Sequence, residues 1–101
     1  MDTAFAVKCT RALLKRHGLD GWKVKLDRSK KRFGYCSYRH NYISLSAPIV
    51  ELNDYAEVKD TILHEITHAL TLVRTGEKGH GETWKAICRE IGATLLSQIT
   101  K

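Results

Sequence analysis

Two histidines separated by three residues form the most informative pattern in the sequence, His64-Glu65-Ile66-Thr67-His68. Residues four apart on an α-helix lie one turn apart on the same side, so both imidazole rings can face one point. A single helix can then supply two nitrogen ligands to one metal ion. Glu65, beside the first histidine, can reach a water on that metal and accept its proton. The pattern predicts a zinc peptidase with Glu65 as its general base.

The helix that carries this pattern is predicted to keep its core face apart from its metal-binding face. At 100° per residue, its apolar side chains form one stripe. The residues of this stripe are Val58, Ile62, Ile66, Ala69 and Val73. His64 and His68 fall on nearly the opposite side, so we interpret them as metal ligands rather than as core histidines.

A third metal ligand must come from another part of the chain, because a catalytic zinc ion usually has three protein ligands and one open position. The common pattern in which a third histidine follows within six residues is excluded, since Thr71 and Arg74 occupy the required positions. His80 lies between two glycines, which let the backbone bring a ring close to a metal. Glu90 on a later helix and the more distant Cys36 are the other candidates. We favour His80, with Glu90 next.

Four helices are predicted from apolar periodicity and from residues that begin or end helices. Their approximate ranges are 3–17, 48–52, 55–73 and 82–91. The residues expected to cap their starts are Asp2 or Thr3, Ser46, and Asn53 or Asp54, and the glycines expected to end them are Gly18 and Gly92. Residues 93–101 form a tail with no clear pattern.

Three short segments before the metal-site helix are predicted as β-strands. They cover residues 22–26, 33–38 and 42–45, with polar turns between them. Alternation of apolar and basic residues in the first predicts one buried and one solvated face. Gly34 in the second is a candidate bulge. The short turns predict a small antiparallel sheet in chain order, with a basic outer face.

Length and composition predict one domain over residues 1–101. The chain is 43% hydrophobic and 28% charged, which suits a soluble protein with one modest core. No apolar run approaches the ~20 residues of a membrane span, and the N-terminus lacks a signal-peptide pattern. Three widely spaced cysteines exclude a zinc ribbon and fit a reducing compartment. We expect a cytoplasmic monomer, located in the nucleoid or a host cytoplasm if a phage encodes it.

Positive charge is concentrated in the first half of the chain. Residues 1–47 carry eleven Lys and Arg against three Asp and Glu, a net charge of +8, whereas residues 48–101 carry −2. Such a surface can neutralise phosphates, and Tyr35, Tyr38 and Tyr42 are candidate rings for base stacking. The predicted nucleic-acid contacts, with single-stranded DNA preferred, are Lys23, Lys25, Arg28, Lys30, Lys31, Arg32 and Arg39. The alternative is a surface that only maintains solubility.

The two histidine motifs together resemble the SprT/Spartan family of zinc metalloproteases. The segment His64-Glu65-x-x-His68-Ala69 is followed by Gly79-His80-Gly81-x-x-Trp84-Lys85, and the strand-rich lead-in ends in Ile43-Ser44-Leu45. The resemblance covers about residues 3–95. It implies a small zincin-like α+β domain that binds one Zn²⁺ through His64, His68 and His80, with Glu65 as general base. Family members include DNA-dependent proteases that cleave proteins crosslinked to DNA. Many carry a C-terminal zinc ribbon, which this sequence does not show.

Three functions fit these patterns, in the order in which we rank them. The first is a SprT-type endopeptidase that cleaves DNA-associated or DNA-crosslinked proteins. The second is a small metallopeptidase that does not depend on DNA. The third is a nucleic-acid-binding module with a non-catalytic zinc site, although no cysteine pair is present to close such a site. We expect a protein substrate to add as a strand along the edge formed by Tyr42 to Ser46, and Tyr42 or Tyr55 to stabilise the oxyanion.

Overall fold

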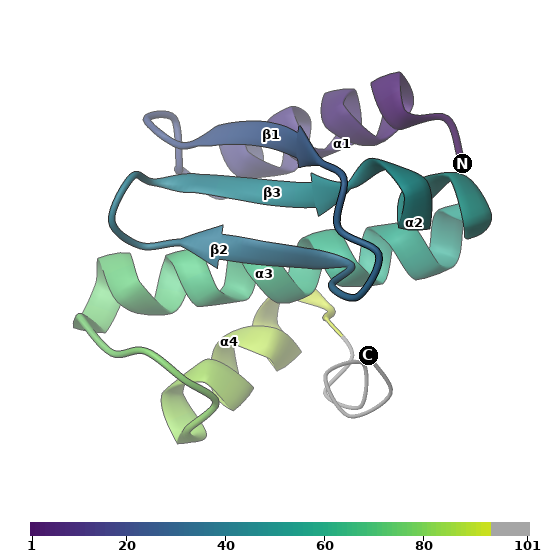
Figure 1. Ribbon diagram of the computed structural model, residues 1–101. Coiled ribbons are helices and arrows are strands. Elements are labelled where there is room, and N and C mark those ends of the chain that lie inside the picture. The colour runs from purple at the N-terminus through teal and green to yellow at the C-terminus, as the bar shows by residue number, and fades with distance from the viewer. Residues whose placement is uncertain (94–101) are drawn as a thin grey trace.

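The computed structural model describes residues 1–93, which form four helices and a three-stranded sheet (Figure 1). The elements, in chain order, are α1 (Thr3–Arg16), β1 (Lys23–Asp27), β2 (Gly34–Ser37), β3 (Tyr42–Ser46), α2 (Ala47–Leu52), α3 (Tyr55–Thr75) and α4 (Glu82–Ile91). The sheet lies in front of α1 and α3, and α4 packs beside α3 (Figure 1). Within the described residues, no helix is both long and apolar enough to cross a membrane. Most of the predicted tail, residues 94–101, lies outside the described residues.

The first three helices begin at residues that the sequence predicted to cap them. In each of the first three, a side-chain oxygen accepts a hydrogen bond from the backbone N–H three residues later. The pairs are Asp2 with Phe5 (2.9 Å), Ser46 with Ile49 (3.2 Å) and Asp54 with Glu57 (3.0 Å). Each such cap stabilises its helix by about 0.5–2 kcal/mol. The metal-site helix α3 therefore starts at a defined residue and runs two residues beyond its predicted end.

The sheet is mixed, so the prediction of a purely antiparallel sheet in chain order is wrong. The strand order is β1-β3-β2, with β3 parallel to β1 and antiparallel to β2. Residues 28–33 connect β1 to β2 across the end of β3, and Ser46 holds this connection in place. Its N–H donates to the Phe33 carbonyl at 2.8 Å, and its hydroxyl donates to the Ser29 carbonyl at 2.6 Å.

Burial explains why β3 rather than β2 is the central strand. Ile43 and Leu45 are fully buried, and Ser44 and Ser46 between and after them are buried as well. A strand that is buried on both faces is best placed between two others, whereas β1 alternates lysines with apolar residues and suits an edge. The hydroxyl of Ser44 is satisfied there by a 2.6 Å hydrogen bond to Asp27.

The helix α3 is buried on both sides, not on one side as predicted. Four members of the predicted stripe are fully buried, but Val73 is 61% exposed because the last turn of α3 lies at the surface. On the opposite side, Thr61, Thr67 and Thr71 are also buried. Each threonine hydroxyl donates to the carbonyl four residues earlier, at 2.7–3.1 Å, so burial leaves no hydroxyl unpaired.

Gly34 brings β2 against α3 and is not a bulge. It pairs in regular register with Leu45. A Cβ atom at this position would lie 3.1 Å from the Ser44 carbonyl oxygen and 3.4 Å from the Thr61 methyl carbon. Only a residue without a side chain lets the strand approach the helix this closely, and this approach sets the distance between the sheet and the metal-site helix.

Candidate metal centre

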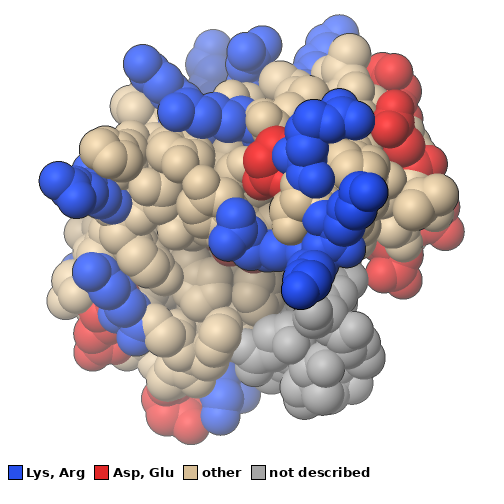
Figure 2. Space-filling view, viewed as in Figure 1, with Lys and Arg blue, Asp and Glu red and all other residues tan. Residues whose placement is uncertain are grey.

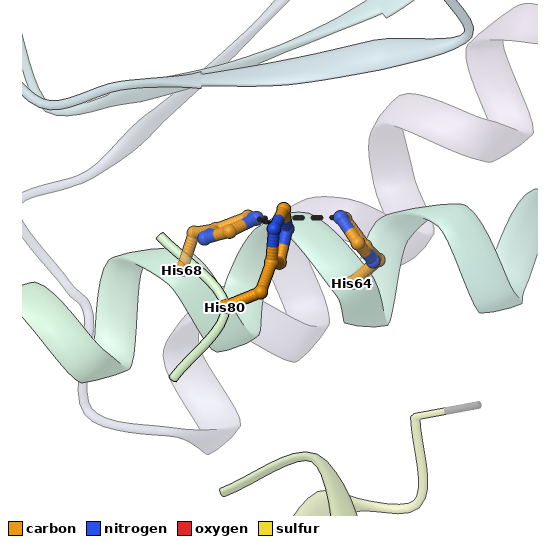
Figure 3. A group of neighbouring side chains, drawn as sticks. All are labelled: His64, His68 and His80. Carbon is orange, nitrogen blue, oxygen red and sulfur yellow. Dashed lines mark hydrogen bonds between the residues drawn. The ribbon is translucent and has the colours of Figure 1, made fainter. Parts of the chain in front are cut away.

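Three imidazole rings from two segments meet beside the middle of α3 (Figure 3). His64 and His68 come from adjacent turns of α3, and His80 comes from the loop between α3 and α4. The Nε2 atom of His68 lies 3.3 Å from Nε2 of His64 and 3.0 Å from Nε2 of His80. The ligand atoms of all three residues lie within 4.8 Å of one another.

The spacing of these nitrogens suits a tetrahedral zinc ion. Zinc–nitrogen bonds of about 2.05 Å at tetrahedral angles place two ligand nitrogens about 3.3 Å apart. Burial, helped by the neighbouring His64 and His80, lowers the pKa of His68 to about 3, and burial also lowers the pKa of His80. Both rings are therefore neutral at physiological pH, which is the form that binds a metal.

The loop that carries His80 is shaped by glycines. Gly79 has φ +90°, a backbone conformation that favours glycine over residues with a side chain. The loop is also attached to the sheet, because the Lys78 ammonium lies 5.1 Å from the ring centroid of Tyr38 at the end of β2. Tyr38 in turn meets the His68 ring edge-on, with centroids 6.4 Å apart. Tyr38 thus connects the loop of the third histidine to the helix of the other two.

Trp84 of α4 contacts all three histidines. Its ring centroid lies 4.6 Å from that of His80, 5.2 Å from His64 and 5.5 Å from His68. The side chain is only 1% exposed, so the indole restricts the rings from the protein side. The indole N–H makes no hydrogen bond within the described part of the chain.

Glu65 lies beside the histidines with its carboxylate largely excluded from water. One carboxylate oxygen is 4.0 Å from Nε2 of His64, and the residue is 7% exposed. Burial raises the pKa of Glu65 to about 7, against the opposing charge of Arg32. A carboxyl group that titrates near neutrality can both accept and return a proton at physiological pH.

Tyr38 and Cys36, on the face of β2 that turns toward α3, border Glu65. Burial raises the pKa of each to about 12, and the charge of Glu65 adds to the shift in both. Tyr38 therefore keeps its proton and remains a hydrogen-bond donor. The sequence indicated Tyr38 only as a stacking ring, although its alternation with Cys36 placed both on one face of the strand.

The other candidate ligands and tyrosines lie elsewhere. Glu90 pairs with Arg74 at 2.7 Å on the surface, and neither it nor Cys36 belongs to the histidine group. Tyr42 donates to or accepts from the Tyr35 hydroxyl at 2.6 Å on the outer face of the sheet. Tyr55 packs against Phe5 at the start of α3. Of the tyrosines, Tyr38 is the one that contacts a histidine of the group.

The predicted nucleic-acid residues are all exposed, and two of them pair with tyrosines on the outer face of the sheet. The Lys25 ammonium lies 4.2 Å from the Tyr42 ring centroid, and the Arg32 guanidinium lies 4.0 Å from that of Tyr35. Figure 2 shows Lys and Arg across the upper edge and right-hand part of this face, with acidic residues mainly at its margins. The remaining predicted contacts lie on a strand or in the connections between strands. Lys23 lies on β1, Arg28, Lys30 and Lys31 lie in the β1–β2 connection, and Arg39 lies in the β2–β3 turn.

Comparison with known proteins gives one family and one fold. The SprT-like family model matches residues 6–101 of this chain. The crystal structure of the metallopeptidase zymogen jannalysin from Methanocaldococcus jannaschii is similar, with a TM-score of 0.65, 19% identity, and coverage of 89% of this chain and 81% of that chain. The metallopeptidase zymogen abylysin from Pyrococcus abyssi gives a TM-score of 0.64, 14% identity, and coverage of 95% and 85%. No match to this chain was found among curated proteins.

Proposed function

Because this chain belongs to the SprT-like family of zinc metalloproteases, we propose that it is a monomeric endopeptidase with one zinc ion bound by His64, His68 and His80. One observation carries this proposal: three imidazole nitrogens converge with zinc-ligand spacing, and the Glu65 carboxylate lies beside them. A non-catalytic zinc site would have no use for a buried carboxyl group at that position.

The roles of the site residues follow from their surroundings. A bound zinc ion supplies a Lewis acid that acidifies water and polarises a peptide carbonyl. Glu65 accepts the proton of the attacking water and passes it to the leaving amine. Tyr38, which stays protonated, donates a hydrogen bond to the carbonyl oxygen as that atom gains negative charge. Trp84 holds the imidazole rings in position.

The substrate backbone, in this proposal, pairs with the free edge of β2. The edge predicted from the sequence, Tyr42 to Ser46, is not available, since β3 is paired on both sides. Within the described residues β2 pairs with β3 alone, and it leads directly to Tyr38 beside the metal centre. Pairing of this kind recognises the substrate mainly through its backbone hydrogen bonds, so we expect only a weak preference for particular side chains.

We further propose that the substrates are proteins bound or crosslinked to DNA. The support is the outer face of the sheet, where Tyr35 and Tyr42 lie under the cations Arg32 and Lys25. Cations neutralise phosphates and tyrosine rings stack on exposed bases, so such a face suits single-stranded DNA. The runner-up is a peptidase that does not depend on DNA, with a basic surface that only maintains solubility.

Metal analysis combined with a cleavage assay tests this function. The substrate is a DNA-binding protein such as a histone, with and without single-stranded DNA, and Glu65→Gln is the inactive control. We expect one zinc per chain and cleavage that DNA stimulates and Glu65→Gln abolishes without loss of zinc. Cleavage that DNA does not change would favour the runner-up. A fully active Glu65→Gln protein would contradict the general-base assignment, and zinc without cleavage would contradict the peptidase.

A further inference from the structure

The sheet has a second free edge, on β1. It lies at the opposite side of the sheet from β2, the strand that leads to Tyr38 beside the histidines. The Lys23 amide donates to the Asn41 carbonyl at 3.0 Å, toward β3. Alternate residues of a strand direct their N–H and C=O groups to opposite edges. Val24 and Leu26 therefore direct theirs away from β3, and within the described residues no strand pairs with that edge.

A groove lies between this edge and α1, and we call it the β1 groove. Its volume is about 510 Å³. The floor is apolar and is made of buried or half-buried side chains. These are Leu14, Leu19, Trp22 and Val24. Further along the same edge Leu26 is 43% exposed, so apolar surface continues beyond the groove.

The rim of the β1 groove is positively charged. Arg11 and Lys15 of α1 and Lys23 of β1 line it, all exposed, against a single carboxylate from Asp20. Lys8 lies on the same helical stripe as Arg11 and Lys15 because the three are spaced by three and four residues. Within the described residues, none of these four cations forms a salt bridge, so their charges are available to a partner.

We propose that the β1 groove binds an extended acidic peptide segment of a partner protein, which adds to β1 as a fourth strand. The backbone of the peptide would pair with Val24 and Leu26, its apolar side chains would cover the floor, and its carboxylates would face Arg11 and Lys15. The site is independent of the metal centre and would hold a partner while the β2 edge is occupied by substrate.

A peptide fits the β1 groove better than a nucleic acid does. Unpaired backbone groups along a strand match another backbone at the strand spacing, whereas a single-stranded nucleic acid needs aromatic platforms for its bases. The tyrosine rings that pair with cations, Tyr35 and Tyr42, lie half-buried on the outer face of the sheet, and the aromatic side chain that lines this groove is the half-buried Trp22 alone.

Nuclear magnetic resonance titration of the whole Glu65→Gln chain, which should not cleave the probe, tests the proposal. The probe is a peptide of about nine residues that alternates glutamate and valine, compared with a lysine–valine peptide and with oligothymidine. We expect the acidic peptide alone to shift the Val24 and Leu26 amides and to slow their hydrogen exchange. Arg11→Gln with Lys15→Gln should weaken its binding about fivefold, as two exposed ion pairs would. Arg89→Gln, on α4, is the matched control and should leave binding of the acidic peptide unchanged.

A backbone variant separates strand addition from charge attraction. Leu26→Pro removes an N–H that the β1–β3 ladder does not use, and an edge strand tolerates this. We expect this variant to stay folded and to lose peptide binding. Three outcomes would overturn the proposal. The two peptides could bind equally well, the amide shifts could be confined to β2, or oligothymidine could bind more tightly than the acidic peptide through Arg11 and Lys15. The absence of any binding at millimolar peptide would overturn it as well. The lysines of the β1 edge would then serve only to prevent aggregation through that edge.

Discussion

At the scale of single residues, the site combines neutral imidazoles with a carboxyl group that is costly to ionise. His68 and Glu65 are both buried, and burial acts on them in opposite directions, lowering the pKa of the imidazole and raising that of the carboxyl. Both shifts favour the uncharged form. Ionising either His68 or Glu65 is therefore costly in the metal-free chain, and a bound cation would favour ionisation of Glu65.

This burial predicts a pH-dependent stability of the metal-free chain. The pKa of Glu65 is about 7 in the folded chain against an ordinary value of 4.5, so the folded state keeps a proton that the unfolded state has lost. The free energy of unfolding should fall as pH rises from about 4.5 to 7, by on the order of 2–3 kcal/mol. Glu65→Gln cannot ionise and should lack this loss.

Urea unfolding with a chelator present, at pH 4 and at pH 8, measures this effect. Relative to the wild type, Glu65→Gln should be more stable at pH 8 than at pH 4. The exposed Glu51→Gln serves as the control and should follow the wild type. If the Glu65→Gln and wild-type chains showed the same change between the two pH values, the assignment of a desolvated carboxyl would be wrong.

At the scale of elements, the site depends on three contacts with α3. The strand β2 approaches through Gly34, α4 brings Trp84 against the histidines, and the intervening loop brings His80. The Lys78 ammonium over the Tyr38 ring joins the loop to the strand. We expect this contact to stabilise the position of the loop by about 0.5–1 kcal/mol. The geometry of the metal centre is therefore a property of how α3, α4 and β2 pack together.

Gly34→Ala should destabilise the protein, because the added methyl group would lie 3.1 Å from a backbone oxygen that cannot easily move. We expect a loss of about 1–3 kcal/mol, typical of overpacking, and weaker zinc binding because β2 would move away from α3. Thermal unfolding and zinc competition measure these. Gly21→Ala is the matched control, since a methyl group added there would meet no neighbouring atom within 4 Å. Equal stability of the two variants would show that β2 does not need this close approach.

At the scale of the whole molecule, charge is divided between the two halves of the chain. The excess of Lys and Arg in residues 1–47 covers α1, the sheet and its connections, whereas α3, which holds two of the three clustered histidines, belongs to the acidic half. The sheet lies in front of α3 (Figure 1), so its outer face and the histidines of α3 are on opposite sides of β2. A protein attached to DNA bound on that face could then reach the β2 edge.

Binding to single-stranded DNA should weaken steeply with salt. Each phosphate contact contributes about 0.7 to the slope of log affinity against log salt concentration. Lys25→Gln and Arg32→Gln should each reduce this slope by about that amount, because each removes one cation from the outer face of the sheet. Fluorescence anisotropy at several salt concentrations measures the slope. Lys59→Gln, on α3, should leave it unchanged, and an unchanged slope in all three variants would place DNA elsewhere or exclude it.

The sequence by itself determined the four helices, their caps and the His64–Glu65–His68 pattern, because these depend on residues within about one helical turn of each other. It also indicated His80, through the glycines beside it. Only the tertiary structure decided the strand order, the burial of both sides of α3 and the position of Tyr38 at the metal centre. These depend on pairings between distant residues, such as Lys23 with Tyr42. Local periodicity shows which face of a strand is buried, but it contains no information about which strand lies beside it.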